Sequence, residues 1–173
     1  MSGMQRGTVP APWRALGESL TGSFAASALG FLASDLVLLD REGSEIGRMR
    51  TDGPEGAELT AGGVKARIER AVPARYRMLS CGAEILASTG DPVSPGITCL
   101  NRPYWARMSL LRNRAEAGPA GNEAVVRIAG GLTNRRYEVT CGAVDEGSLP
   151  VALFLLYRIV TLRRAAYRAG PSA

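Results

Sequence analysis

A run of consecutive apolar residues near the C-terminus, from Leu149 to Tyr157, constrains the fold more than any other feature of the sequence. A helix through these residues has no polar face, so it must be buried in protein or lie in a membrane. A membrane span needs about 20 such residues, and Arg158 interrupts the run directly after Tyr157. The sequence therefore predicts a core helix that the rest of the chain encloses, with a membrane anchor as the alternative.

Local signals place this helix at residues 149–168. Ser148 is a residue type that is favoured at the N-cap, and Pro150 is tolerated in the first turn. Basic residues follow near the other end, where they suit the negative pole of the helix dipole: Arg163, Arg164 and Arg168. Gly170 and Pro171 then indicate the end of the helix.

The middle of the chain is a series of short strand candidates separated by turn residues. Residues 36–39 and 46–50 are expected to form a hairpin around a polar turn that contains Gly43. Residues 64–69 alternate between apolar and charged side chains, as is typical of a half-buried strand. Further candidates are residues 75–79, 84–86, 97–100, 104–111, 124–128 and 136–140. Many short strands at this spacing favour an antiparallel sandwich or barrel over a parallel sheet.

The length and composition fit one domain. The chain has 173 residues, of which 46% are hydrophobic and 21% are charged, as in an average soluble protein. A chain of this length needs no disulfide or metal to fold. Residues 1–30 are poor in charge and rich in small side chains, and they predict a lead-in that is weakly ordered or helical. Residues 31–168 are predicted to form a single barrel domain around the core helix.

The absence of histidine excludes several classes of chemistry within this chain. Without an imidazole it cannot form a Ser-His-Asp or Cys-His catalytic site or a His-ligated metal site. The three cysteines contain no CxxC pair. An enzyme would need a pocket lined by Cys81, Cys141 or Lys65 with a perturbed pKa. No acid, base and nucleophile group together in the sequence, so we expect no enzymatic activity, no catalytic residues, no metal site and no cofactor.

Positive charge is concentrated at the end of the chain. The net charge is +5, and the residues from Gly147 onward include four arginines and no acid. A basic end of this kind can contact phosphate, in lipid headgroups or in nucleic acid, or it can merely solvate a helix end. Arg102 and Arg107 flank an aromatic pair and form the best aromatic-basic cluster. Nucleic acid stays a minor alternative, because only 6% of the residues are aromatic and no RNP-like strand is present.

An all-β chain that ends in a hydrophobic helix resembles the tubby C-terminal-like superfamily. The hairpin at residues 36–48 and the ending at residues 145–162 carry the resemblance, which covers residues 31–168. The superfamily includes the tubby proteins, the plant LURP-one-related proteins and the phospholipid scramblases, and this chain resembles the bacterial LURP-one-related and scramblase-related members most. The resemblance implies a mainly β fold, an antiparallel barrel of about twelve strands that encloses the hydrophobic C-terminal α-helix.

The resemblance also implies a non-enzymatic protein that binds lipid or a membrane surface. Tubby-like members bind phosphoinositides through basic surface residues, and scramblases act at membranes. No phosphoinositide motif matches here residue by residue, so the expected headgroup contacts are the basic residues singled out above: Arg163, Arg164, Arg168, Arg102 and Arg107. The expected location is the cytoplasm, peripheral at the membrane. The alternative is a soluble structural or protein-interaction module that has a protein partner and no lipid affinity.

Arg158 departs from this resemblance, because an enclosed helix should not carry an unpaired charge. Two arrangements would accommodate the guanidinium. It could reach the barrel mouth by snorkelling, or it could meet a carboxylate such as Glu69, Glu84 or Glu138.

Overall fold

The computed structural model describes residues 7–29, 35–142 and 144–170. The helices in these residues are α1 (Ala11–Leu20), α2 (Ser148–Ala169) and the short 3-10 helix η1 (Gly53–Glu55). The strands are β1 (Ser23–Ala28), β2 (Asp35–Leu39), β3 (Glu45–Asp52), β4 (Gly56–Ala61), β5 (Val64–Val72), β6 (Arg75–Ser80), β7 (Ala83–Thr89), β8 (Gly96–Cys99), β9 (Arg102–Ser109), β10 (Arg114–Pro119), β11 (Val126–Gly130) and β12 (Arg136–Cys141).

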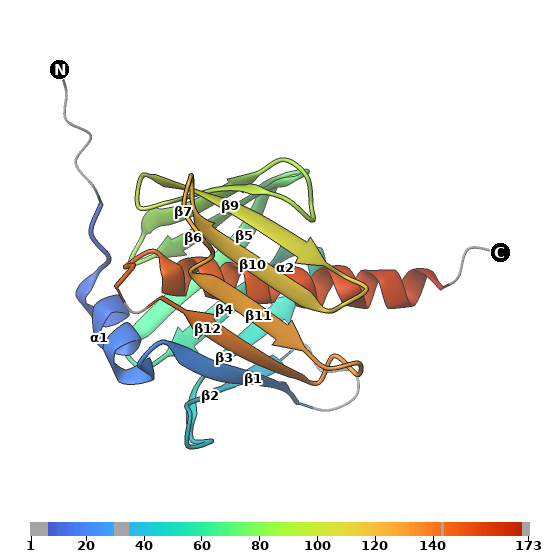
Figure 1. Cartoon of the computed structure of the whole chain (residues 1–173), viewed down its shortest axis with the longest axis horizontal. Coiled ribbons are helices and arrows are strands. Elements are labelled where there is room, and N and C mark those ends of the chain that lie inside the picture. The colour runs from blue at the N-terminus through green and yellow to red at the C-terminus, as the bar shows by residue number, and fades with distance from the viewer. Residues whose placement is uncertain (1–6, 30–34, 143, 171–173) are drawn as a thin grey trace.

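The strands form a closed antiparallel barrel (Figure 1). Each strand pairs with its neighbours in the chain, and β1 closes the sheet by pairing with β12, with Phe24 opposite Val139. Closure leaves no sheet edge with unpaired backbone groups. The predicted antiparallel barrel is confirmed, and so is the hairpin of β2 and β3, in which Leu36 lies opposite Met49.

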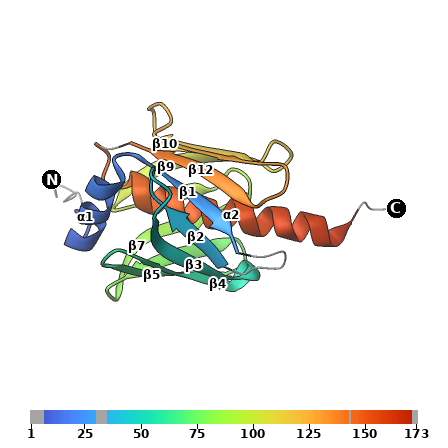
Figure 2. The same cartoon turned by 90° about the horizontal axis from the view of Figure 1, so that it is seen from below.

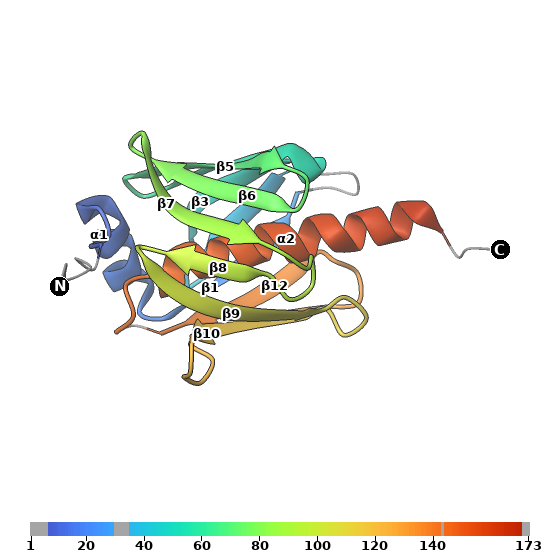
Figure 3. The ribbon, with the colours of Figure 1, turned by 90° about the horizontal axis from the view of Figure 1, so that it is seen from above.

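Helix α2 runs through the barrel and leaves it at one end (Figures 2 and 3). Its side chains from Ser148 to Thr161 are buried on every face, and those from Ala165 onward are exposed. This arrangement confirms the predicted enclosed helix and explains why the apolar run needs no polar face. No helix among the described residues combines the length and the apolar character that crossing a membrane requires.

Helix α1 covers the end of the barrel at which α2 begins, called the capped end below (Figure 1). Trp13, Leu16 and Leu20 are buried there, and the Trp13 indole Nε1 donates a hydrogen bond of 2.9 Å to the Ser80 hydroxyl. Arg14 forms an ion pair of 3.1 Å with Glu146, which lies just before α2. The opposite end, from which residues 165–170 of α2 emerge, is called the exit end.

The predicted lead-in at residues 1–30 requires a correction. Residues 11–20 are helical, but Ser23–Ala28 is strand β1, which lies between β2 and β12 and completes the barrel. The barrel therefore begins before residue 31. The segment Ser23–Ala28 contains one large side chain among alanines and serines, so it has little intrinsic strand preference, and pairing on both sides forms the strand. Residues 1–6 and residue 30 of the predicted lead-in lie outside the described residues.

The predicted helix at 149–168 agrees with α2 to within a residue at each end, but the predicted role of Ser148 is wrong. Gly147 occupies the N-cap position, and no side chain caps the helix there. The Ser148 hydroxyl instead donates to the carbonyl of Gly142 at 2.7 Å. Gly170 ends the helix as predicted, and Pro171 lies outside the described residues.

Arg158 does not meet any of the carboxylates that the sequence suggested. Its guanidinium lies 4.2 Å from the centroid of the Tyr76 ring, near the exit end. Glu69 pairs with Arg67 and Arg77, and Glu138 pairs with Arg136, while Glu84 is exposed. A cation above the face of an aromatic ring is stabilised by the ring quadrupole, so an aromatic face takes the place of the expected carboxylate.

Replacing one aromatic side chain on the buried part of α2 and one on its exposed part tests whether the barrel encloses the helix. Phe154→Ala should lower the free energy of unfolding by about 3–5 kcal/mol, because the ring is fully buried and leaves a cavity. The matched control is Tyr167→Ala on the exposed part of the same helix, which should change it by less than about 0.5 kcal/mol. Urea denaturation measures both, and equal effects would contradict the enclosed arrangement.

Candidate functional site

Exposed apolar side chains gather at the exit end of the barrel. Of the seven large hydrophobic residues that are exposed in the described chain, six lie at this end: Leu29, Val72, Val93, Leu111, Leu132 and Tyr167. The seventh, Val144, lies at the capped end. Single exposed apolar residues are common, but a concentration of them at one end is typical of an interaction surface. We call this set of six residues the exit rim.

The two most exposed leucines of the exit rim lie in neighbouring turns. Leu111 lies between β9 and β10 and is 93% exposed, and Leu132 lies between β11 and β12 and is 90% exposed. Asn113 joins the two turns by donating from its side-chain amide to the carbonyl of Gly131 at 2.7 Å. The Gly130 amide donates in return to the carbonyl of Asn113 at 2.8 Å. These contacts hold the two leucines at the tips of turns that are fixed at their bases.

Arg163, a predicted headgroup contact, belongs to the base of these turns. Its guanidinium donates to the carbonyl of Leu110 and to the side-chain oxygen of Asn134, one acceptor from each turn. The side chain is buried. Arg163 therefore links α2 to the two turns and does not offer its charge to a ligand in solution.

The other two C-terminal arginines, Arg164 and Arg168, lie at the exit end and are more exposed to solvent than Arg163. Arg168 is exposed, and Arg164 is half-buried and donates to the Thr51 hydroxyl at 3.2 Å. Burial lowers the pKa of Arg164, and the positive charge of Arg168 lowers it further, against the opposing effect of Tyr137. Arg164 nevertheless stays cationic near neutral pH, because the arginine pKa is far above it.

The turn that carries Leu111 adds two arginines that the sequence did not single out. Arg112 and Arg114 are exposed, and neither forms an ion pair with another described residue. Acidic residues also lie at the exit end: Asp52 and Glu55 are near η1, and Asp91 is in the β7–β8 loop, which neighbours the Leu111 turn. Glu55 there pairs with Arg70 at 3.3 Å. Leu111 therefore lies beside two exposed arginines.

The remaining predicted contacts, Arg102 and Arg107, lie away from the exit rim. Arg102 is at the capped end and pairs with Asp145 at 3.2 Å. Arg107 is on the outer wall of the barrel, where it pairs with Glu116 at 2.7 Å and lies 5.2 Å from the Trp105 ring centroid. The structure therefore does not bring these two residues together with the C-terminal arginines, and a carboxylate already compensates each charge.

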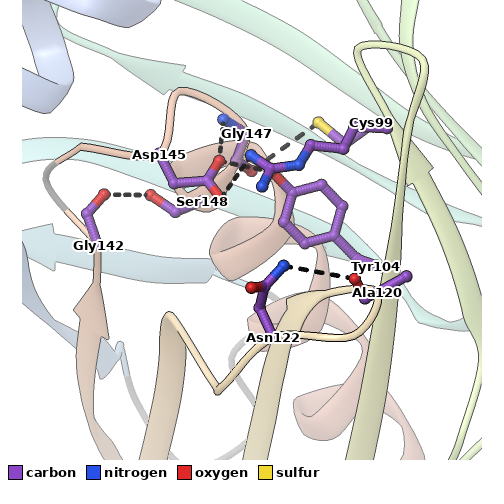
Figure 4. A network of polar contacts seen from close by, with 9 residues as sticks. Cys99, Tyr104, Ala120, Asn122, Gly142, Asp145, Gly147 and Ser148 are labelled. Carbon is purple, nitrogen blue, oxygen red and sulfur yellow. Dashed lines mark hydrogen bonds and ion pairs between the residues drawn. The ribbon is translucent and has the colours of Figure 1, made fainter.

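A second polar cluster lies at the capped end, around the residues that precede α2 (Figure 4). The Asp145 carboxylate accepts a hydrogen bond of 2.6 Å from the Tyr104 hydroxyl and one of 3.0 Å from the Gly147 amide. The Cys99 thiol contacts the Gly147 carbonyl at 3.8 Å. Burial raises the pKa of Tyr104, and the hydrogen bond to Asp145 raises it further. The cluster fixes the start of α2 and keeps Tyr104 protonated.

The residues considered for catalysis differ in burial: Cys141 is buried on β12, whereas Cys81 and Lys65 are at the surface beside the paired residues Ser80 and Ala66. Burial raises the pKa of Cys141 to about 11 and that of Cys99 to about 12, so neither forms a thiolate near neutral pH. Cys81 and Lys65 are exposed, in the β6–β7 turn and on β5. The described residues contain no group of three potential His, Cys, Asp or Glu metal ligands.

The hollows in the described residues are small, because α2 fills the barrel. One is an apolar space of about 170 Å³ beneath α1, lined by Leu16, Leu20 and Leu153 among others. Another, of about 220 Å³, opens at the exit end beside Arg158. The first leaves no room for a water molecule and the second holds about one, so neither approaches the roughly 300 Å³ at which pockets for drug-sized ligands begin. Neither of these two hollows is a ligand cavity like that of a hollow barrel.

No protein-family model matches the chain, and no curated protein sequence matches it significantly. The X-ray structure of a protein from Arabidopsis thaliana, AT5G01750, is similar with a TM-score of 0.55 and 9% sequence identity. The match covers 84% of this chain and 92% of that chain. At this identity the similarity shows a shared fold, so the antiparallel barrel around a C-terminal helix recurs in a plant protein.

The cysteine environments predict selective alkylation. At about pH 8 a thiol reacts through its thiolate, and the raised pKa values keep Cys99 and Cys141 protonated. Iodoacetamide should therefore label Cys81 alone in the folded protein and all three cysteines in denaturant. Mass spectrometry of the peptides measures this, and a label on Cys99 or Cys141 in the folded protein would contradict the structure.

Removal of the Arg163 guanidinium should destabilise the exit end. Arg163→Met removes the charged donor to the Leu110 carbonyl and to the Asn134 side-chain oxygen, which keep only longer hydrogen bonds from neutral donors, and this should cost about 2–3 kcal/mol of unfolding free energy. Arg168→Met, the matched control on the exposed turn of α2, should change it by less than about 0.5 kcal/mol. Urea denaturation separates the two, and a neutral Arg163→Met would exclude the linking role of this side chain.

Proposed function

We propose that this protein is a non-enzymatic, tubby-like barrel that binds the surface of anionic membranes through its exit rim. The observation that carries the proposal is the concentration of six of the seven exposed large hydrophobic residues at one end, next to exposed arginines. An anionic bilayer combines an apolar interior with a negatively charged surface, so a rim of this composition is complementary to it.

The apolar part of the proposed contact consists of Leu111, Leu132 and Tyr167. These side chains are 93%, 90% and 71% exposed, and they project from two turns and from the emerging helix. Each leucine that enters the acyl boundary gains part of the transfer free energy of its side chain, about 1 kcal/mol for partial burial. Tyrosine suits the headgroup level, because its ring is apolar and its hydroxyl remains in a polar layer.

The electrostatic part consists of Arg112, Arg114 and Arg168, with a contribution from Arg164. The first three are exposed and form no ion pair with another described residue. A basic residue near an anionic surface contributes about 1 kcal/mol at physiological salt. The proposal keeps two of the arginines expected from the sequence, Arg164 and Arg168, and adds the pair beside Leu111. Arg163, Arg102 and Arg107 are left out, because their guanidinium groups already have protein partners.

Membership of the tubby C-terminal-like superfamily is part of the proposal. The topology of twelve strands around a C-terminal helix, shared with the Arabidopsis protein, supports it. The expected location, in the cytoplasm and peripheral at the membrane, follows from the proposed surface binding. The protonated buried cysteines and the filled barrel support a binding function without catalysis.

Vesicle flotation of the full-length protein tests the membrane proposal. Binding is expected to vesicles that contain phosphatidylserine, not to neutral vesicles, and it should weaken as salt increases. Leu111→Ser combined with Leu132→Ser should weaken binding about thirtyfold, because about 1 kcal/mol is lost at each of the two positions. Arg112→Ser combined with Arg168→Ser should have a similar effect at low salt. The matched control is Val144→Ser, which changes the 97% exposed residue of the capped end.

Three outcomes would overturn the proposal. A complete absence of binding would favour a soluble structural or protein-interaction module. Salt-resistant binding to neutral and anionic vesicles alike would indicate insertion of α2 and an open barrel. If Val144→Ser weakened binding as much as the paired leucine variant, the contact would not be at the exit rim.

A further inference from the structure

The hollow at the exit end has a buried arginine in its wall. It opens between the β5–β6 turn at Ala74 and the β7–β8 loop at Pro92 and Pro95, and Arg158 and Ser88 line it as well. Its free space holds about one water molecule. We infer that this hollow binds one oxygen atom of a phosphate-type oxyanion. This inference requires no membrane, so it goes beyond the proposed function.

Arg158 supplies the positive charge. The residue is 7% exposed, and among the described residues no carboxylate forms an ion pair with it. The Tyr76 ring, 4.2 Å from the guanidinium, compensates part of the charge but accepts no conventional hydrogen bond. A guanidinium carries five N–H donors in a planar fork that matches the oxygens of phosphate. A buried charge that lacks an anionic partner is stabilised when an anion binds.

The polar neighbours of Arg158 bring no negative charge. The Tyr157 hydroxyl lies beside the guanidinium and donates to the Gly53 carbonyl at 2.9 Å, and burial raises the pKa of Tyr157. The Tyr76 hydroxyl donates to the Pro54 carbonyl at 2.8 Å. Tyr157 therefore stays neutral near physiological pH, and the protons of both hydroxyl groups are already donated to backbone carbonyls.

Ser88 supplies a second donor on the wall of the hollow. It is 4% exposed, and its hydroxyl makes no hydrogen bond to any of the described residues. Ser88 Oγ is not among the fully buried, unpartnered side-chain atoms of the described residues, so it is accessible from the hollow and can donate to a group there. Arg158 and Ser88 together offer donors to an anionic oxygen.

Asp91 is the one acidic residue that lines the hollow. It is exposed, and its Oδ1 accepts hydrogen bonds from the amides of Val93 at 2.8 Å and Ser94 at 3.2 Å. The carboxylate does not neutralise Arg158, and it repels an approaching anion. The site should therefore bind anions weakly in the natural sequence and more tightly when this carboxylate is removed.

Titration of the full-length protein with inorganic phosphate tests the site, with sodium chloride holding the ionic strength constant. Calorimetry should show saturable binding that Arg158→Met abolishes. Methionine keeps an unbranched apolar chain, and apolar replacement of a buried charge is often tolerated. Ser88→Ala should weaken binding about threefold, and Asp91→Asn should tighten it about threefold. Arg107→Met is the control with the same chemical change on the outer wall of the barrel, where the guanidinium is already paired with Glu116.

Two results would overturn the inference. One is a heat of phosphate addition that does not saturate, or that is the same in Arg158→Met as in the natural sequence. The other is an affinity that neither Ser88→Ala nor Asp91→Asn changes. These two variants keep the test decisive if Arg158→Met does not fold.

A further arm identifies the source of the oxyanion. Vesicles that contain phosphatidic acid should compete with inorganic phosphate if the site takes a lipid headgroup, and they should not compete if it takes free phosphate. The variant with Leu111→Ser and Leu132→Ser should bind inorganic phosphate normally. Failure of the exit rim as a membrane contact and failure of this site are therefore measured separately.

Discussion

The structure depends on the burial of α2 on all sides. A helix whose inner half lacks a polar face must be covered around its whole circumference, which a flat sheet cannot do. A closed barrel covers it and at the same time pairs the backbone groups of every strand, from β1 around to β12. The same arrangement fills the interior with side chains such as Phe154 and Tyr157. Ligand contacts are therefore restricted to the surface and the two ends.

The sequence predicts the elements in which side-chain size alternates, and it misses those built from small residues. The predicted helix and hairpin agree with α2, β2 and β3. The strands that were missed are β1, β4 and β10, with the sequences SFAASA, GAELTA and RAEAGP. Alanines such as Ala26 and Ala117 are fully buried in them, which leaves space for the large side chains of α2. A pattern of small residues has little hydrophobic contrast, so only the tertiary context shows these strands.

The candidate site could be predicted only in part, for a related reason. Arg164 and Arg168 were found because a basic helix end is a local feature. Leu111 and Leu132 are single leucines in polar turns, and they become a surface only when closure of the barrel places the turns side by side. The ion pair of Arg102 with Asp145 could not be predicted from the sequence either, since the two residues are distant along the chain. The fold decides which charges are exposed and which are already paired.

The two buried arginines of α2 show how the fold separates structure from function. Arg163 and Arg158 are five positions apart, so they point to different sides of the helix. Arg163 meets neutral acceptors from two turns, which satisfy the directional donors of its guanidinium. The Arg158 guanidinium instead lies over the Tyr76 ring, and the residue lines the hollow at the exit end. Arg163 is buried and its guanidinium donates to acceptors within the chain, whereas Arg158 lines an open hollow and still has capacity for an anion.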